Sequence, residues 1–391
     1  MSTQVLHVVT SIARGGAQNH LVDLVRHQRA AGVAVTVAYL RAHGYWAPAL
    51  REMGATVSDL RLRFYGDLRP LRELRRLLAG TRFDLVHAHL EPAELYLRLA
   101  LLGTSAKELP LIISKHNDRP FHCFPGQRAL GRWVARRASA VIAISEAVRK
   151  FMTGPSLGLK PGTVQTIHYG LGAQPFEKVT EASAAALRRE WGAGAETLVI
   201  GFAGRLVEQK SIDTLIRAFA LLRQRAPGET KLVIAGCGPL EAALRRCAEE
   251  QGVTDHVVWA GFREDVPRMM KAFDVFALTS VHEGFGLVLV EAMAAARPVV
   301  ATRAGAIPEV VVDGETGFLA EPAQPQQVAD ALLKLTDAAV RARLGAAGHR
   351  RVLANFTLEQ MWRQTDALYA RCLRAESGCT SGAAVAAAPL A

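Results

Sequence analysis

The stretch VFALTSVHEGFGLVLVEAM, from Val275 to Met293, predicts a buried strand, a loop with two glycines and the start of a helix. Strands that alternate with helices in this way form a parallel sheet. Further strand-like runs lie at residues 5–9, 33–40, 84–87, 111–114, 140–144 and 164–168, and again at 197–203, 231–235, 256–260 and 298–301. The sequence therefore predicts an α/β fold with two doubly wound, Rossmann-like parallel sheets.

The alternation pauses at residues 169–195, where glycines accumulate, and the pause predicts a domain junction. We expect an N-terminal domain over 1–175 and a C-terminal domain over 176–356. Residues 357–374 predict a helix that packs back toward the N-terminal domain, and the Ala-, Ser- and Gly-rich residues 375–391 are expected to be disordered. Because ligands bind beyond the carboxyl ends of parallel strands, the expected site is a central cleft that the two domains face.

The composition is that of a globular protein, with 50% hydrophobic and 21% charged residues among 391, and it excludes wholesale disorder. Five scattered cysteines without a CxxC pair argue against a disulfide scaffold or a cysteine zinc site. No apolar run reaches the roughly 18 residues that span a bilayer, and the N-terminus does not resemble a signal peptide. We therefore expect a cytoplasmic protein.

The net charge of +11 is concentrated in residues 1–180, which carry 24 of the 47 Lys and Arg but 12 of the 36 Asp and Glu. Six arginines lie between residues 61 and 76. A second group surrounds Trp133, and its spacing places three arginines on one helix face. Such a surface could bind an anionic membrane or a phosphorylated lipid, or it could bind nucleic acid. It could also be a solvated surface without a partner. The members of the two groups are Arg61, Arg63, Arg69, Arg72, Arg75 and Arg76, and Arg128, Arg132, Arg136 and Arg137.

Two carboxylates and two glycines follow the strand that begins at Val275. If the chain from Glu283 to Glu291 were fully helical, these carboxylates would lie about 12 Å apart. That separation exceeds the roughly 5–5.5 Å of a retaining-glycosidase pair and suits carboxylates that grip different parts of one elongated ligand. Gly284 and Gly286 permit close backbone approach, and the amides that begin the next helix would face an anion.

Cations stand at the end of another strand, because Arg205 follows the run 197–203 directly and Lys210 precedes the next helix. Two cations at this place suit a diphosphate. In the N-terminal half, His116 follows a strand and could orient a sugar hydroxyl.

Gly15 and Gly16, between the first strand and a helix, could contact a phosphate or a sugar, although the chain has neither a GxGxxG fingerprint nor a P-loop. His87 and His89 could in principle bind a metal ion. No Asp, Glu or Cys at suitable spacing accompanies them, so no metal site is expected.

Four blocks in the C-terminal half, at residues 203–210, 235–240, 280–293 and 304–319, carry a family resemblance, and weaker matches lie at Gly15-Gly-Ala-Gln, 84–89 and 167–170. On these residues the sequence resembles glycosyltransferase family 4, the retaining, nucleotide-sugar-dependent group with the GT-B fold (glycosyl transferases group 1). The chain departs from the family pattern at Ser211 and Ala306, where glycines are usual. Neither departure removes a charged residue.

The resemblance implies that Arg205 and Lys210 bind the donor diphosphate and stabilise the leaving nucleotide, and that Glu291 binds the ribose hydroxyls. It also implies that Glu283 faces the transferred sugar and that His116 contacts it. The catalytic residues implied are Glu283, His116, Arg205 and Lys210. The donor-binding residues implied are Gly15, Gly16, Arg205, Lys210, Gly284, Phe285, Gly286, Leu287 and Glu291. The family implies no cofactor and no metal, with a UDP- or GDP-sugar as the donor substrate.

The implied function is transfer of a sugar from a nucleotide-diphosphate donor to a glycan or lipid-linked acceptor in cell-envelope polysaccharide or lipopolysaccharide synthesis. The basic N-terminal half allows peripheral binding at the inner face of the cytoplasmic membrane. One alternative is a sugar-nucleotide epimerase on the same fold, which would need an acid/base pair and no second substrate. The other is a basic nucleic-acid-binding protein, against which stands the lack of a recognised motif and of aromatics interleaved with the charges.

Overall fold

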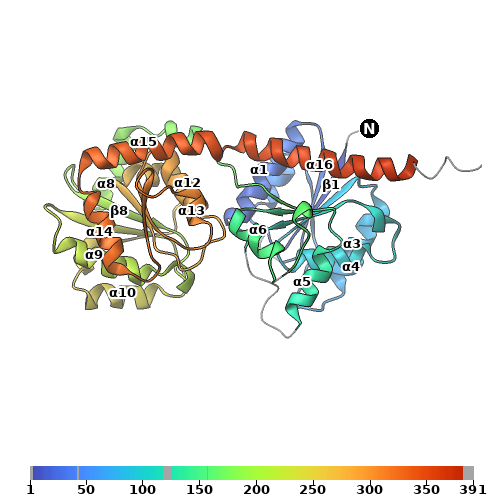
Figure 1. Ribbon diagram of the computed structural model, residues 1–391, viewed down its shortest axis with the longest axis horizontal. Helices are drawn as coiled ribbons and strands as arrows, with labels where there is room; N and C mark the ends of the chain where they lie inside the picture. The colour runs from blue at the N-terminus through green and yellow to red at the C-terminus, as the bar shows by residue number, and fades with distance from the viewer. Residues whose placement is uncertain (1–2, 42–43, 118–125, 156, 382–391) are drawn as a thin grey trace, which may run out of the picture. The chain divides into compact units, whose positions relative to one another are not determined.

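The computed structural model describes residues 3–41, 44–117, 126–155 and 157–381, with backbone alone at 376–381. It divides into two compact units (Figure 1). Unit 1 comprises Met1–His168 and Glu359–Ala391, and unit 2 comprises Tyr169–Leu358. Each unit contains one parallel sheet with helices on both faces.

The sheet of unit 1 has the strand order β3-β2-β1-β4-β5-β6-β7, all parallel. Its strands are β1 (Gln4–Val9), β2 (Ala34–Tyr39), β3 (Thr56–Asp59), β4 (Leu85–His89), β5 (Leu111–Lys115), β6 (Ala140–Ala143) and β7 (Val164–Thr166). Its helices before α16 are α1 (Gly16–Ala30), α2 (Ala47–Glu52), α3 (Arg69–Gly80), α4 (Ala93–Leu101), α5 (Gln127–Ala135) and α6 (Glu146–Thr153), with the 3-10 turns η1 (Ser105–Glu108) and η2 (Pro161–Thr163).

The central strands are buried on both faces, which explains their continuous apolar runs. Alternate residues of β1 enter two different hydrophobic clusters. Leu6 and Val8 pack in the cluster that α3 and α4 share, whereas Val9 packs with α1 residues such as Leu21 and Val25. His7 therefore points to the face that α1 covers.

The sheet of unit 2 has the order β10-β9-β8-β11-β12-β13, also all parallel. Its strands are β8 (Leu198–Ala203), β9 (Thr230–Ala235), β10 (Val257–Gly261), β11 (Val275–Leu278), β12 (Val299–Thr302) and β13 (Gly317–Ala320). Its helices are α7 (Gln174–Glu177), α8 (Glu181–Glu190), α9 (Ile212–Arg223), α10 (Glu241–Glu250), α11 (Val266–Ala272), α12 (Leu287–Ala294), α13 (Ile307–Val310), α14 (Pro325–Lys334) and α15 (Ala338–Asn355), with η3 (Glu208–Lys210) and η4 (Thr254–His256).

Both sheets have the doubly wound order that reverses beside the first strand, between β1 and β4 and between β8 and β11. The predicted fold class is therefore confirmed. The two strands that the sequence did not predict, β3 and β13, lie at sheet edges. The sequence of β3, Thr-Val-Ser-Asp, is half-exposed and polar and so lacks the apolar run of a buried strand.

Helix α16 (Leu358–Ser381) packs on unit 1. The His27 ring of α1 stacks on Trp362 with centroids 4.6 Å apart, and its Nε2 lies 2.7 Å from an Asp366 carboxylate oxygen. The helix continues past residue 374, so residues 375–381, expected in a disordered tail, are helical. Ala375 and Glu376 have good helix propensity, which favours this continuation. Residues 382–391 lie outside the described residues. No helix in the described part of the chain is long and apolar enough to cross a membrane.

Candidate active site

An ion pair joins the loops that follow β8 and β11 in unit 2. Lys210 Nζ donates a hydrogen bond to Glu283 Oε2 at 2.6 Å, and each side chain is 13% exposed. The pair lies where the strand order of the sheet reverses, at the carboxyl edge, which is the usual ligand site of a doubly wound sheet. The two residues are far apart in the sequence, and the adjacency of β8 and β11 brings them together.

Side-chain and backbone hydrogen bonds hold these loops in place. Thr279 Oγ1 donates to the backbone oxygens of Lys210 and Ser211 at 3.2 and 2.8 Å. Ser280 Oγ donates to Glu283 Oε2 at 3.2 Å, and the Ala306 amide donates to the Glu283 carbonyl at 2.9 Å. A site fixed by such contacts is preorganised for its ligand before the ligand arrives.

One glycine allows the loop after β12 to touch the loop of Glu283. A Cβ atom at Gly305 would lie 2.1 Å from the Glu283 carbonyl oxygen, and Gly305 has a φ of +55°. Any side chain at this position would therefore push the two loops apart. The next residue, Ala306, departs from the family pattern and is the buried N-cap of α13. Its backbone is in the right-handed region, so its methyl group causes no backbone strain.

Helix α12 begins at Leu287, with Gly286 as its N-cap in the left-handed conformation. No side chain caps this end and its first turn contains no acid. The first amides of the helix are thus suited to an anion. Residues 283–286 are not helical. The separation of about 12 Å expected between Glu283 and Glu291 assumed a continuous helix, so that estimate does not apply. Burial raises the pKa of Glu291, within α12, to about 7.

Arg205 is placed differently from Lys210. Its backbone lies where the loops after β8 and β9 meet, since a Cβ atom at Gly236 would lie 1.8 Å from the Gly204 carbonyl oxygen. The Arg205 side chain is exposed, and within the described ranges no acidic residue pairs with it. The structure therefore brings Lys210 and Glu283 together and leaves the Arg205 guanidinium available to a ligand.

In unit 1, the candidate residues lie at the carboxyl edge of the sheet. Gly15 is the N-cap of α1 and Gly16 is its first residue, with no side-chain cap and no acid in the first turn. His116 follows β5, and its ring lies 5.9 Å from that of His20 and 5.8 Å from that of His89. Burial, and then the charges of neighbouring groups, lower the pKa of His116 well below its usual value. His116 is therefore a neutral hydrogen-bonding group near pH 7.

A buried cation next to His116 is not among the residues that the sequence singles out. Lys115 Nζ donates to Glu94 Oε2 at 2.5 Å and to Glu91 Oε1 at 3.2 Å. Burial lowers the pKa of Lys115, but the two carboxylates outweigh burial and raise it. The signal in the sequence was a lysine as the last residue of an apolar strand, a place where a buried charge needs a partner.

Two doubly wound parallel units, with anion-suited loops at the reversal point of the second, are the architecture of GT-B glycosyltransferases. Residues 14–172 match the family model described as Glycosyltransferase Family 4, and residues 197–338 match Glycosyl transferases group 1. The chain belongs to this family of glycosyltransferases, and the resemblance found in the sequence is confirmed.

Relatives and solved structures support the same assignment. The chain is 33% identical over 292 residues to the GDP-mannose-dependent alpha-(1-6)-phosphatidylinositol monomannoside mannosyltransferase of Mycolicibacterium smegmatis, covering 70% of this chain and 73% of that protein. It is 30% identical to the alpha-D-kanosaminyltransferase of Streptomyces kanamyceticus, covering 69% and 71%. Alignments with other curated relatives span as little as 39% of their length. Anabaena HepE in complex with UDP and glucose superposes with a TM-score of 0.84 at 25% identity, covering 94% of this chain and 100% of HepE.

Proposed function

We propose that the chain transfers a hexosyl group, with retention, from a nucleoside diphosphate sugar to a glycan or lipid-linked acceptor in cell-envelope polysaccharide or lipopolysaccharide synthesis. The observation that carries the proposal is the Lys210–Glu283 pair beside the uncapped start of α12. The likeness to HepE, solved with UDP and glucose, supports a nucleotide-sugar donor. The likeness to a mannosyltransferase named for a phosphatidylinositol mannoside supports a lipid-linked acceptor.

In this proposal the donor diphosphate takes the place of Glu283 as the main partner of the Lys210 ammonium. Arg205 and the first amides of α12 add charge and hydrogen bonds to the departing diphosphate, which gains negative charge as the anomeric bond breaks. Because these groups are already cationic or dipolar, donor binding needs no metal ion. Glu283, freed in part from Lys210, accepts hydrogen bonds from hydroxyls of the transferred sugar.

The remaining site residues bind the two ends of the donor. Glu291 accepts hydrogen bonds from the ribose hydroxyls, while Gly284, Phe285, Gly286 and Leu287 present backbone to the sugar and phosphates. From unit 1, neutral His116 contacts the sugar, and Gly15 and Gly16 leave room for the phosphates.

A transfer assay with purified protein tests the proposal. A thermal-shift screen with UDP- and GDP-sugars first selects the donor that raises the melting temperature most. Turnover of that donor should fall in Arg205→Ala, Lys210→Ala and Glu283→Ala, and persist in the surface controls Arg225→Ala and Lys271→Ala. Wild-type turnover should be unchanged when EDTA is present in the assay. Near-normal turnover in all three site variants would refute the assignment. Epimerised donor formed without acceptor would favour the epimerase instead.

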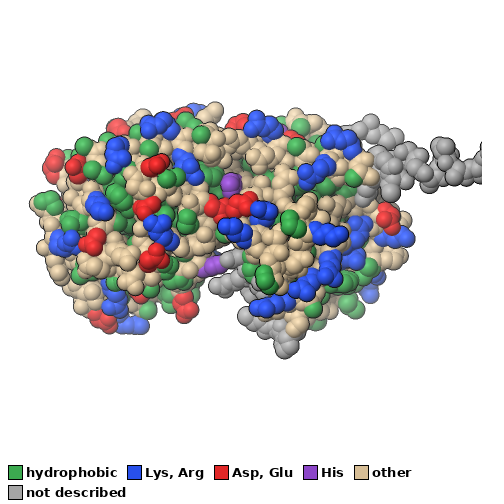
Figure 2. Space-filling view, viewed as in Figure 1, with side chains coloured by type: hydrophobic (Ala, Val, Ile, Leu, Met, Phe, Trp, Pro, Cys, Tyr) green, Lys and Arg blue, Asp and Glu red, His purple; other side chains and the backbone are tan. Residues whose placement is uncertain are grey.

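The basic surface of unit 1 supports an acceptor held at a membrane. Figure 2 shows Lys and Arg side chains gathered over α3, α4 and α5. The exposed apolar side chains Phe64, Tyr65 and Leu68 lie beside the first arginine group in the sequence, and half-exposed Trp133 lies under the Arg98 guanidinium at 4.8 Å. Arginines with interspersed exposed aromatic and aliphatic side chains suit an anionic bilayer. A cavity of about 480 Å³ there is lined by Arg98, Ala129, Arg132, Trp133, Arg136 and Arg137.

Co-sedimentation with vesicles of anionic and of zwitterionic lipid tests this surface. Binding should be salt-sensitive, specific for the anionic vesicles, and reduced about thirtyfold or more in Arg132→Glu/Arg136→Glu, since each basic residue near such a membrane contributes about 1 kcal/mol and both charges are reversed. The exposed control Arg225→Glu on unit 2 should bind as the wild type does. Equal binding by the double variant would remove the membrane from the proposal, and tighter binding to RNA than to vesicles would favour nucleic acid.

A further inference from the structure

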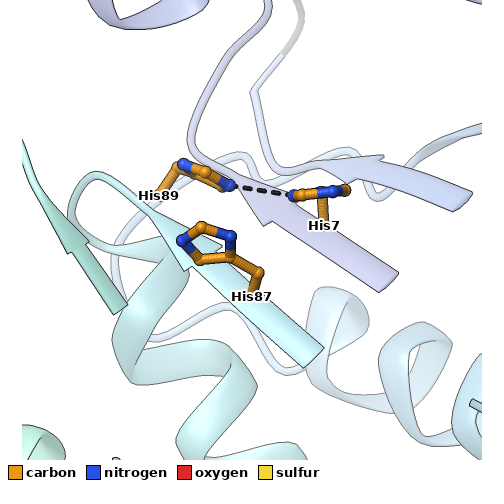
Figure 3. A group of neighbouring side chains, drawn as sticks. All are labelled: His7, His87 and His89. Atoms are coloured by element: carbon orange, nitrogen blue, oxygen red, sulfur yellow. Dashed lines mark hydrogen bonds between the residues drawn. The ribbon is translucent and has the colours of Figure 1, made fainter. Parts of the chain in front are cut away.

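Three buried histidines converge at the point where the strand order of unit 1 reverses. His7 of β1 and His87 of β4 are paired in register, and His89 lies two residues further on the same face of the sheet. Their exposed fractions are 0%, 0% and 1%. One ring nitrogen from each lies within 4.8 Å of those of the other two (Figure 3). The sequence around His87 and His89 offers no third ligand at suitable spacing, and β1 supplies one.

Neighbouring side chains orient these rings. His7 Nε2 donates to the Gln28 Oε1 amide oxygen at 2.9 Å, which leaves the lone pair of His7 Nδ1 directed at His89 Nε2, 3.0 Å away. His87 is held by Ser114 Oγ at 2.8 Å and by the Tyr369 hydroxyl of α16 at 2.5 Å. A ring nitrogen that binds a metal usually has its partner nitrogen fixed by such an oxygen.

The electrostatic environment keeps the cluster neutral. Burial lowers the pKa of His7 to about 4 and those of His87 and His89 well below their usual value. Neutral imidazole is the form that binds metal ions. His89 Nδ1 is buried and has no hydrogen-bond partner among the described residues, so the hydrogen bonds within the cluster do not satisfy all its nitrogens.

We propose that His7, His87 and His89 bind one transition-metal ion, with Zn²⁺ the expected occupant. Three imidazoles without a carboxylate select Zn²⁺, Cu²⁺ or Ni²⁺ over Mg²⁺ and Ca²⁺, which prefer oxygen ligands. Two nitrogens at about 2.0–2.1 Å from a tetrahedral zinc ion lie about 3.3 Å apart, close to the 3.0 Å between His7 Nδ1 and His89 Nε2. Binding replaces that hydrogen bond and one of the two bonds of His87, while Gln28 keeps its bond to His7.

The role of this ion is structural. It joins β1 to β4, and through the retained bond to Gln28 the ligand His7 contacts α1, so the ion would fasten this helix to the sheet of unit 1. The donor site proposed above is built from residues of unit 2 together with His116, Gly15 and Gly16, none of which is a ligand here. The ligands are thus distinct from the residues of the proposed transfer reaction, although the ring of His89 lies 5.8 Å from that of His116.

The test uses the full chain produced in cells supplied with zinc, because the buried ligands favour metal uptake during folding. After gel filtration, elemental analysis should find about one zinc per chain in the wild type and in His349→Ala, a control on α15 of unit 2. His7→Gln and His89→Gln, which retain a hydrogen-bonding side chain, should contain less than a tenth of that amount. Chain produced with cobalt should show the intense visible bands of a tetrahedral site, absent from His89→Gln.

Three results would overturn the proposal. The first is folded wild-type protein without stoichiometric zinc. The second is equal zinc in the wild type and in folded His89→Gln, which would indicate surface binding only. The third is a wild-type chain that contains cobalt but lacks the visible absorption bands of a tetrahedral site. This result decides the question even if both glutamine variants fail to fold.

Discussion

Each unit holds a lysine–glutamate pair near the carboxyl edge of its sheet, and the two pairs differ in burial. The side chains of Lys115 and Glu94 in unit 1 are 4% and 1% exposed, whereas those of Lys210 and Glu283 in unit 2 are each 13% exposed. The first pair joins a strand to a helix, and the second joins two loops. A buried pair between regular elements maintains structure, while a pair between loops at the reversal point can exchange its partner for a ligand.

The same contrast holds for the residues at the two reversal points. Between β1 and β4 lie buried, neutral histidines, and beyond β8 and β11 lie charged residues that solvent can reach. One strand order thus supports two chemistries. In the roles that we propose, the sheet of unit 1 holds sugar hydroxyls and a transition-metal ion, and that of unit 2 holds the donor diphosphate.

The largest expected effect is on stability and belongs to the buried pair. Lys115→Met leaves the Glu94 carboxyl without its cation, and removing one partner of a buried ion pair costs about 3–5 kcal/mol. Burial already raises the pKa of Glu94 to about 7 in the wild type, and loss of the Lys115 cation raises it further, so the unfolded chain loses its proton before the folded chain does. The stability deficit should therefore grow as the pH rises above about 4.5, the usual value for the carboxyl.

Urea denaturation of Lys115→Met at pH 5 and pH 8 measures this loss. Lys115→Met/Glu94→Gln, which also removes the unpaired carboxyl, should recover part of the stability. A Lys115→Met variant as stable as the wild type at both pH values would show that the buried pair is not structural.

The next effect is catalytic and belongs to the loop pair. Lys210→Ala should reduce kcat/KM about 10²–10³-fold, the effect of removing one preorganised group that stabilises transition-state charge. Its free energy of unfolding should change less than that of Lys115→Met, because both side chains are 13% exposed and retain more contact with solvent. Steady-state kinetics and urea denaturation of the same preparation give both numbers. A large stability loss with normal turnover would reverse the roles assigned to the two pairs.

One glycine substitution in each unit tests how closely the backbone is packed at the loops of that unit. Gly236→Ala places a methyl group 1.8 Å from a backbone oxygen at a φ of +134°, so we expect a stability loss of about 2 kcal/mol or more. Gly15→Ala meets the flexible Gln18 side chain at an extended φ of 162°, so its stability should change by less than about 1 kcal/mol. Thermal unfolding of both variants checks the difference, and equal losses would contradict it.

The smallest effect concerns pH. Ribose hydroxyls donate to an ionised carboxylate better than to a protonated one, and Glu291 has a pKa of about 7. Nucleotide binding should lower that pKa, so affinity should rise by up to about tenfold between pH 6 and pH 8 and then level off. Calorimetric titration with UDP and GDP measures this. The Glu291→Gln variant should show a flat profile, and a wild-type profile that is also flat would remove Glu291 from the ribose site.

The sequence predicted most of the fold because buried parallel strands are apolar throughout. It predicted the loops of Lys210 and Glu283 separately, since each follows a strand. Their direct pairing could not be predicted without knowing that β11 lies beside β8. The same holds for His7 and His87, which are distant in sequence and adjacent only through the register of β1 and β4. Lys115 was missed because its partners lie on the preceding loop and helix rather than at a recognisable spacing.

The most direct measurement of the central claim is a crystal structure of the chain with UDP or GDP, whichever raises the melting temperature more. We predict the diphosphate within hydrogen-bond distance of Lys210 Nζ and of the first amides of α12. A diphosphate bound elsewhere, with Lys210 still paired to Glu283 alone, would contradict it.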